Sequence, residues 1–214
     1  EALQCPTLLR NGFGGHRIEG IGDKHVPWIH NVKNTDLVIG VDDRDCMDTL
    51  RLFNEDVGRE YLVKKGVDGD LVQKLDLLGI SGIGNLIAAI KFARYYELQE
   101  DDVVVTVLTD SMELYESRRR EMHEDMGAFT AGNAERVLHT AFLEQRIDNV
   151  LELSYYEKLR VHNLKYYTWI EQQKKELEYL NAQWYDKEYW HRIQALTPEI
   201  DRVIEEFNRE AGLI

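Results

Sequence analysis

The stretch GISGIGNLIAAIKFARYYELQEDDVVVTVL, residues 79–108, holds the pattern that decides the fold. Its glycine-rich opening leads into a helix that we expect over residues 86–98, where apolar residues recur at helical spacing. The run VVVTVL at residues 103–108 follows, and β-branched apolar runs of this length are typical of strands buried in a parallel sheet. The stretch therefore predicts a helix that crosses over to a strand.

The residues before this stretch show the same alternation. LVIGV at residues 37–41 is a second short apolar run, which we expect to form another buried strand. Asp42 and Asp43 follow it as N-cap candidates for a helix that runs through Phe53. The order strand, helix, turn, helix, strand predicts an α/β domain with parallel strands and crossover helices.

After Tyr115 the strand signals stop, and charged and aromatic residues of high helix propensity dominate. Thr197-Pro198 is a clear helix start, with Thr as N-cap and Pro at the first helical position. We expect helices near residues 113–126, 133–145, 149–173, 175–195 and 198–211. The predicted organisation is an α/β domain over residues 1–117, followed by an all-helical extension over residues 118–214.

Composition narrows the classes of function. The 214 residues are 43% hydrophobic, which suits one or two globular domains with a core. The net charge of -13 argues against a nucleic-acid partner, because phosphate binding needs clustered basic residues. We interpret the run Arg118-Arg119-Arg120 as a solvated helix face. No stretch approaches the ~20 apolar residues that span a bilayer, so no membrane partner is expected.

Cysteine and histidine spacing predicts neither a disulfide scaffold nor a metal site. Cys5 and Cys46 lie far apart without a CxxC partner, so a reduced, cytoplasmic setting is the default. The histidines near Asp23 lack the pairing of a zinc site. The N-terminus shows no secretion signal. The opening residues EALQCPT contain no initiator Met and begin no helix or strand, so we expect this chain to be part of a longer protein.

Three segments are candidates for ligand binding, and each allows a structural alternative. The glycines of Gly20-Ile21-Gly22 let the backbone approach a ligand closely, or they form a plain connecting loop. Ser81 can cap a helix, or it can offer its hydroxyl to a ligand beside the helix N-terminus. Asp110 follows the second strand, at the edge where open α/β sheets bind ligands and where helix caps also occur. Taken one at a time, the segments leave both interpretations open.

The order and spacing of the three segments resemble the cysteine synthase and cystathionine β-synthase family of fold-type-II pyridoxal-phosphate enzymes. The family motif HKIQGIG is matched by HRIEGIG at residues 16–22. A GISSG-like turn is matched by GISG at residues 79–82, and a strand ending in LPDSGERY is matched by LTDSMELY at residues 108–115. The resemblance covers about residues 1–117 and implies part of the large domain of that fold.

The resemblance also implies cofactor-binding residues. Ser81 falls where the family places a hydroxyl that faces the pyridine nitrogen of pyridoxal 5'-phosphate. A neutral hydroxyl does not hold that nitrogen protonated, which favours α-proton loss and β-elimination over transamination. Residues 20–22 would lie over the cofactor, with Gly82 and Asp110 beside it. The implied activity is a lyase or β-replacement reaction on a small amino acid such as serine, cysteine or O-acetylserine, in a homodimer.

The sequence also departs from the family pattern. Gly82 replaces the second serine of the turn, Met112 stands where the family has glycine, and the segment 56–78 is longer than usual. No lysine lies in a motif like that of the cofactor-binding lysine, and no glycine-rich phosphate loop is present. We therefore assign no catalytic residue, and we expect activity from a full-length protein rather than from this chain alone.

The helical extension supports an alternative of another class. Its aromatic residues can form a core or a subunit interface, where Tyr and Trp are enriched. They are Tyr155, Tyr156, Tyr166, Tyr167, Trp169, Tyr179, Trp184, Tyr185, Tyr189 and Trp190. The alternative function is a non-catalytic structural or dimerisation module. An oxidoreductase with a nucleotide-binding fold is disfavoured, because no GxGxxG motif follows a strand.

Overall fold

The computed structural model describes residues 1–214, which divide into two compact units. Unit 1 contains residues 1–24 and 37–153, and unit 2 contains residues 25–36 and 154–214. The boundary expected after residue 117 falls inside a helix of unit 1. The compact units of the structure therefore do not coincide with the segment that resembles the enzyme family.

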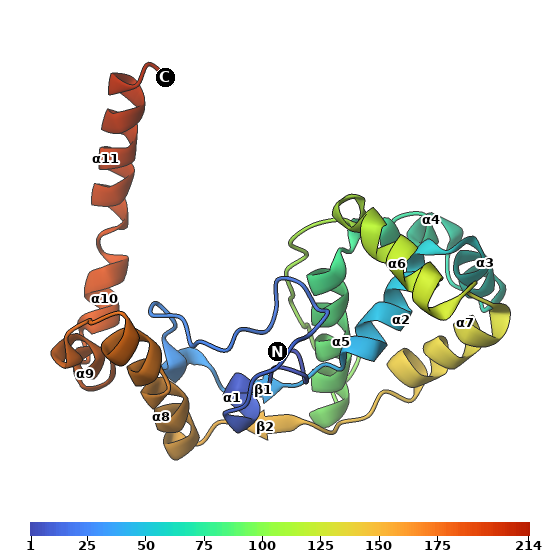
Figure 1. Cartoon of the computed structure of the whole chain (residues 1–214), viewed down its shortest axis with the longest axis horizontal. Helices are drawn as coiled ribbons and strands as arrows, with labels where there is room; N and C mark the ends of the chain where they lie inside the picture. The colour runs from blue at the N-terminus through green and yellow to red at the C-terminus, as the bar shows by residue number, and fades with distance from the viewer. The chain divides into compact units, whose positions relative to one another are not determined.

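The core of unit 1 is built around the helix α2 (Asp43–Asn54). It starts where the sequence predicts, because the carboxylate of Asp42 accepts a hydrogen bond from the backbone N–H of Arg44 at 2.8 Å. α2 contacts α3 (Asp56–Lys64), α5 (Ile80–Tyr95) and α7 (Ala131–Leu138), as Figure 1 shows. Leu50 of α2 and Ile83 and Ile87 of α5 are fully buried in this core.

The sheet of unit 1 has two short strands. β1 (Leu37–Ile39) confirms the first predicted strand, but it pairs antiparallel with β2 (Val150–Glu152), in the region where we expected only helix. The expected helix over 149–173 is therefore wrong at its start. Lys91 of α5 is buried beside the sheet, where its ammonium donates to the carbonyl of Gly40 at 3.0 Å and to Asp148 at 3.1 Å.

The second predicted strand, residues 103–108, is not formed. The segment has no regular structure, and Val103 and Val105 are 85% and 87% exposed. The carbonyl of Val107 accepts a hydrogen bond from the side chain of Asn85, but no other strand lies alongside to pair with the backbone. A strand needs a neighbour for its N–H and C=O groups, so strand propensity alone does not form one. The structure thus contains no parallel pair of these two segments.

The remaining helices of unit 1 are shorter or lie at its surface. They are α1 (Thr7–Arg10), α4 (Gly69–Val72) and α6 (Glu116–Met126), with 3-10 turns at Leu75–Leu77 and Met112–Tyr115 and a π-helical turn at His139–Leu143. Helix α5 begins at Ile80, six residues earlier than expected, so that Ser81 and Gly82 lie inside its first turn.

Unit 2 is helical and holds all four tryptophans of the chain. Its helices are α8 (Tyr155–Asn163), α9 (Leu177–Tyr185), α10 (Tyr189–Gln194) and α11 (Thr197–Glu210), with a 3-10 turn at Val32–Asn34 and a π-helix at Tyr166–Gln172. Trp184 is buried and Trp169 stacks edge-on against Trp28, whereas Tyr156 and Tyr185 are exposed. The aromatic residues therefore divide between core and surface.

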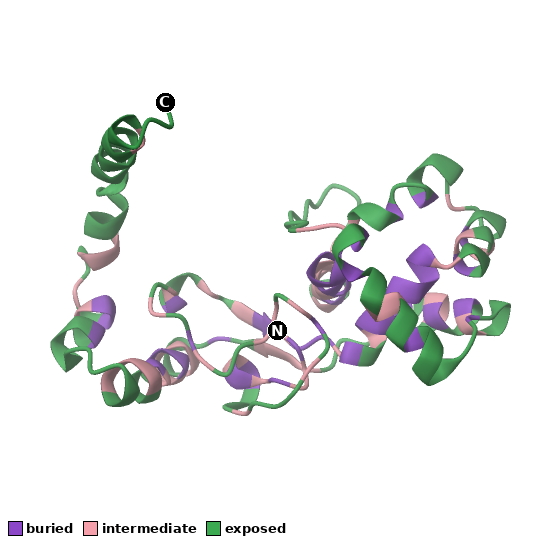
Figure 2. Ribbon diagram, turned by 45° about the horizontal axis from the view of Figure 1, so that its top comes forward, coloured by how far each residue is buried: buried purple, intermediate pink, exposed green.

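Helix α11 contrasts with the rest of unit 2, because nearly every residue in it is exposed (Figure 2). It begins within one residue of the predicted start, with Pro198 in its first turn, but its N-cap residue is Leu196 rather than Thr197. No helix of the chain combines the length and the apolar character that crossing a bilayer requires.

Candidate functional site

The three candidate segments of the sequence come together in unit 1. The Ser81 hydroxyl lies 2.5 Å from that of Thr109, and a Cβ atom on Gly20 would lie 3.4 Å from the Cβ of Ser81. Asp110 is joined to the same cluster, since the Thr109 hydroxyl donates to its carboxylate at 3.4 Å. We name Ser81, Thr109, Asp110 and Tyr115 the Ser81 cluster.

Ser81 is positioned by the first turn of α5 rather than used to cap it. The N-cap residue of α5 is Gly79, and no side chain caps the helix. Ser81 is 4% exposed, and its hydroxyl is turned toward Thr109, which lies 28 residues later in the sequence. The capping alternative for Ser81 is therefore wrong, and its hydroxyl is paired with that of Thr109 instead.

Asp110 does not cap a helix either. Its carboxylate accepts a hydrogen bond from the Tyr115 hydroxyl at 2.5 Å, and its carbonyl accepts one from the N–H of Gly79 at 2.9 Å. The hydrogen bond to Asp110, together with burial, raises the pKa of Tyr115 to about 12, so the phenol stays protonated and remains a donor. The bond from Gly79 holds Asp110 against the start of α5, and the bond from Tyr115 fixes the orientation of the Asp110 carboxylate.

The loop Gly20-Ile21-Gly22 packs on the same helix start. Gly20 and Gly22 have φ of 83° and 96°, the left-handed region in which side chains are strained. A Cβ atom on Gly84 would lie 3.4 Å from Ile18 and 3.5 Å from Ile21, so this glycine allows the loop to lie against α5. The loop therefore lies against the first turns of α5, with Gly20 beside Ser81 and Ile21 beside Gly84.

Two further contacts concern Gly82, which was predicted to bind the cofactor, and Arg118, which was expected to be solvated. Gly82 faces Leu108, since a Cβ atom there would lie 3.5 Å from the Leu108 side chain, and this contact packs the helix rather than extending the polar cluster. Arg118 of α6 pairs with Glu19 at 2.5 Å and fastens the loop from outside. Arg118 belongs to the basic run expected to be a solvated face, and it is about one-third exposed. This pairing was not predicted, because no local pattern links residues so far apart.

The Ser81 cluster fits only part of a pyridoxal phosphate site. A buried hydroxyl near a glycine loop suits one edge of an aromatic ring, and the cluster carries a single carboxylate, that of Asp110. No lysine is hydrogen-bonded to Ser81, Thr109 or Asp110, and the buried Lys91 bonds elsewhere. The residues present therefore supply a hydroxyl wall but neither a covalent nor a phosphate anchor.

Comparison with known proteins gives one match of partial coverage. No family model and no solved structure matches the chain. Cysteine synthase B of Campylobacter jejuni is 31% identical to it over 115 residues, which are 54% of this chain and 31% of that protein. The chain thus spans about a third of the length of the curated relative it matches. Over about half of its residues, this chain is similar to a cysteine synthase, and that similarity points to a cysteine synthase-like family.

Proposed function

We propose that the chain is the carboxyl-terminal portion of a pyridoxal-phosphate enzyme of the cysteine synthase type. The enzyme would act on a small amino acid such as serine, cysteine or O-acetylserine by β-elimination or β-replacement. The observation that carries the proposal is the buried Ser81 hydroxyl, 2.5 Å from Thr109 and walled by the Gly20 loop. The similarity to cysteine synthase B also supports it.

In this proposal the chain positions the cofactor ring and forms a neutral hydrogen bond to its pyridine nitrogen. The cofactor, when bound, supplies the electron sink for loss of the α-proton. Ser81 would donate a neutral hydrogen bond to the pyridine nitrogen without protonating it, and the Thr109 hydroxyl would then donate to the Ser81 oxygen instead of to Asp110. The Gly20-Ile21-Gly22 loop would cover the ring and exclude water. Tyr115 would keep Asp110 hydrogen-bonded and away from the ring.

The absence of a lysine in the Ser81 cluster gives the first test. The chain is incubated with pyridoxal phosphate, treated with borohydride, and its lysines are examined by mass spectrometry. We expect low modification spread over exposed lysines, as in the urea-unfolded control. A stoichiometric adduct on a single lysine of the folded chain would show that the catalytic lysine lies here, against the proposal.

The second test uses the longest polypeptide that the gene encodes. That protein should carry the visible absorbance of bound pyridoxal phosphate. Ser81→Ala should lower its elimination or replacement rate about fivefold, which corresponds to about 1 kcal/mol for one neutral hydrogen bond. Ser111→Ala is the matched control, since Ser111 makes no side-chain cap. A protein without the absorbance contradicts the proposal.

The exposed helix α11 favours a second candidate, an assembly module. Ile200, Val203 and Phe207 are 51%, 50% and 64% exposed and follow the three-and-four spacing of a helix-pairing seam. The candidate partner is a second copy of the chain. Light scattering should show a dimer that Val203→Glu combined with Phe207→Glu dissociates, while Glu205→Gln leaves it intact. A strict monomer at high concentration excludes this role.

A further inference from the structure

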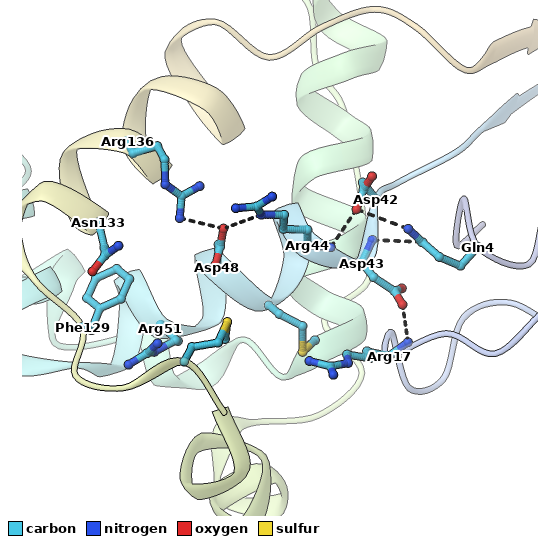
Figure 3. Close-up of a pocket in the computed structure, with 12 residues that line it drawn as sticks. Gln4, Arg17, Asp42, Asp43, Arg44, Asp48, Arg51, Phe129, Asn133 and Arg136 are labelled. Carbon is cyan, nitrogen blue, oxygen red and sulfur yellow. Dashed lines mark hydrogen bonds and ion pairs between the residues drawn. The ribbon is translucent and has the colours of Figure 1, made fainter. Parts of the chain in front are cut away.

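Unit 1 contains a polar pocket that shares no lining residue with the Ser81 cluster. It has a volume of about 410 Å³ and lies beside the start of α2, with walls from the N-terminal segment, α7 and the residues just before α7 (Figure 3). Charged groups of both signs line it together with a patch of apolar side chains. The chain has a net charge of -13, yet four arginines gather at this one pocket.

One side of the pocket offers guanidinium donors. Arg136 lies 2.9 Å and Arg44 lies 3.7 Å from the same oxygen of Asp48 (Figure 3). A guanidinium carries five N–H donors, so a single shared carboxylate leaves most of them available. Two such groups fit a further carboxylate in the bidentate geometry that arginine prefers.

The other side offers an acceptor without a donor. Asp43 is 9% exposed, and one of its carboxylate oxygens accepts a hydrogen bond from the N–H of Arg17 at 2.6 Å. The other oxygen, Oδ1, is buried without a hydrogen-bond partner. Burial raises the pKa of Asp43, which reflects this unfavourable position. A buried carboxylate oxygen lacking a donor is costly, and an ammonium group would satisfy it.

One pocket presents all of these groups to an occupant. Asp43 and Asp48 both line it from α2, five residues apart. Between and beside them the pocket presents Met47 and Phe129, and Phe129 is itself stacked 5.1 Å from the Arg51 guanidinium. An occupant that uses all of these groups carries an anion, a cation and an apolar group.

We propose that this pocket binds a free α-amino acid with an apolar side chain. The ligand carboxylate is held by Arg44 and Arg136, and its ammonium donates to Oδ1 of Asp43. Its side chain packs against Phe129 and Met47. This site is independent of the Ser81 cluster, so the inference does not require pyridoxal phosphate.

The test is calorimetric titration of the chain with L-phenylalanine and L-methionine in the absence of cofactor. We expect saturable binding of both. N-acetyl-L-phenylalanine and L-phenylalanine amide each lack one charge, and each should bind at least about tenfold more weakly than L-phenylalanine. Equal binding of the N-acetyl derivative would overturn the proposal in favour of a simple anion site. Absence of saturable binding to the folded chain would overturn it altogether.

Variants assign the binding to this pocket. Asp43→Asn keeps the shape and removes the charge, and Arg136→Lys keeps the charge and removes the fork. Both should weaken L-phenylalanine binding about tenfold, whereas the exposed Arg120→Gln should not. Binding unaffected by Asp43→Asn contradicts the proposal. Ser81→Ala should leave this binding unchanged, which separates the result from that of the proposed enzyme function.

Discussion

At the scale of single residues, Gly79 is where the Ser81 cluster closes most tightly. A Cβ atom at this position would lie 2.8 Å from Cγ of Asp110 and 3.0 Å from the ring of Tyr115. Neither neighbour moves freely, because Asp110 and Tyr115 are hydrogen-bonded to each other. We expect Gly79→Ala to lower the free energy of unfolding by about 1–3 kcal/mol, measured by urea unfolding and circular dichroism.

The matched control for Gly79→Ala is Gly69→Ala at the start of α4. A Cβ atom on Gly69 meets nothing within 4 Å. This substitution should be neutral or stabilise the fold by less than ~1 kcal/mol. Equal destabilisation by the two variants would show that the contacts of Gly79 have no special effect.

His162 gives a prediction about pH. Burial, and then the nearby Lys165, lower the pKa of His162 to about 4, from 6.5 for the ordinary group. The unfolded chain therefore binds the proton first, and stability present above pH 6.5 is lost as the pH falls toward 4. Between about pH 7 and pH 5 the loss should be on the order of 1–2 kcal/mol.

Urea unfolding followed by tryptophan fluorescence measures this loss, because every tryptophan lies in unit 2. His162→Gln should reduce the dependence on pH and leave the smaller part that comes from His30, whose pKa is lowered by the same causes, while the exposed His191→Gln should keep all of it. An unchanged slope in His162→Gln would contradict the assignment to this histidine.

The residues of the Ser81 cluster show what sequence can predict at this scale. Ser81 and Asp110 could be singled out because they lie in short motifs. The hydroxyl pair of Ser81 with Thr109 and the bond from Tyr115 to Asp110 could not, since they depend on how closely α5 approaches the segment after residue 108. The pocket beside α2 was missed for the same reason: its arginines are scattered along the sequence and meet only in the fold.

At the scale of elements, local patterns predicted those that are stabilised locally. β1, α2 and the start of α11 were predicted from a strand run, an Asp N-cap and Thr-Pro. α5 was expected to start too late, because its glycines were interpreted as a turn. Burial of Ile80, Ile83 and Ile87 outweighs the low helix propensity of glycine there. β2 was missed since it exists only through its distant partner.

The unpaired segment 103–108 leads to a prediction about aggregation. Exposed β-branched residues with free backbone groups are a template for pairing with another chain. Val103→Lys combined with Val105→Lys should slow aggregation, followed by light scattering over time. Val63→Lys, on the exposed part of α3, should not. Equal aggregation of the double variant and the parent chain would exclude the segment as the site.

At the scale of the whole molecule, the two units should respond separately to core substitutions. Lys165 is fully buried in unit 2 and donates to the carbonyls of Trp28 and His30 and to Gln183. Lys165→Met leaves these acceptors unsatisfied and should cost unit 2 about 3 kcal/mol or more. Leu50→Ala, in the core of unit 1, should cost about 2–5 kcal/mol.

Two signals from one urea titration distinguish these effects. Tryptophan fluorescence reports the unfolding of unit 2, and circular dichroism reports both units. Lys165→Met should move the fluorescence transition to lower urea concentration. Leu50→Ala should leave that transition in place and move only the part of the circular dichroism signal that comes from unit 1. A fluorescence midpoint that moves equally in both variants would show a single cooperative unit instead.

The pairing of β1 with β2 also governs when the molecule can fold during its synthesis. Leu37 pairs with Glu152 and Ile39 with Val150. More than a hundred further residues must therefore be synthesised before the backbone groups of β1 can form their hydrogen bonds with β2. Helices α2, α3 and α5 can form earlier from nearby contacts, but the sheet closes unit 1 only after β2 has left the ribosome. Until then the backbone groups of β1 lack partners, in addition to those of the segment 103–108, which stays exposed in the folded chain as well. This is the interval in which a chaperone would have most to protect.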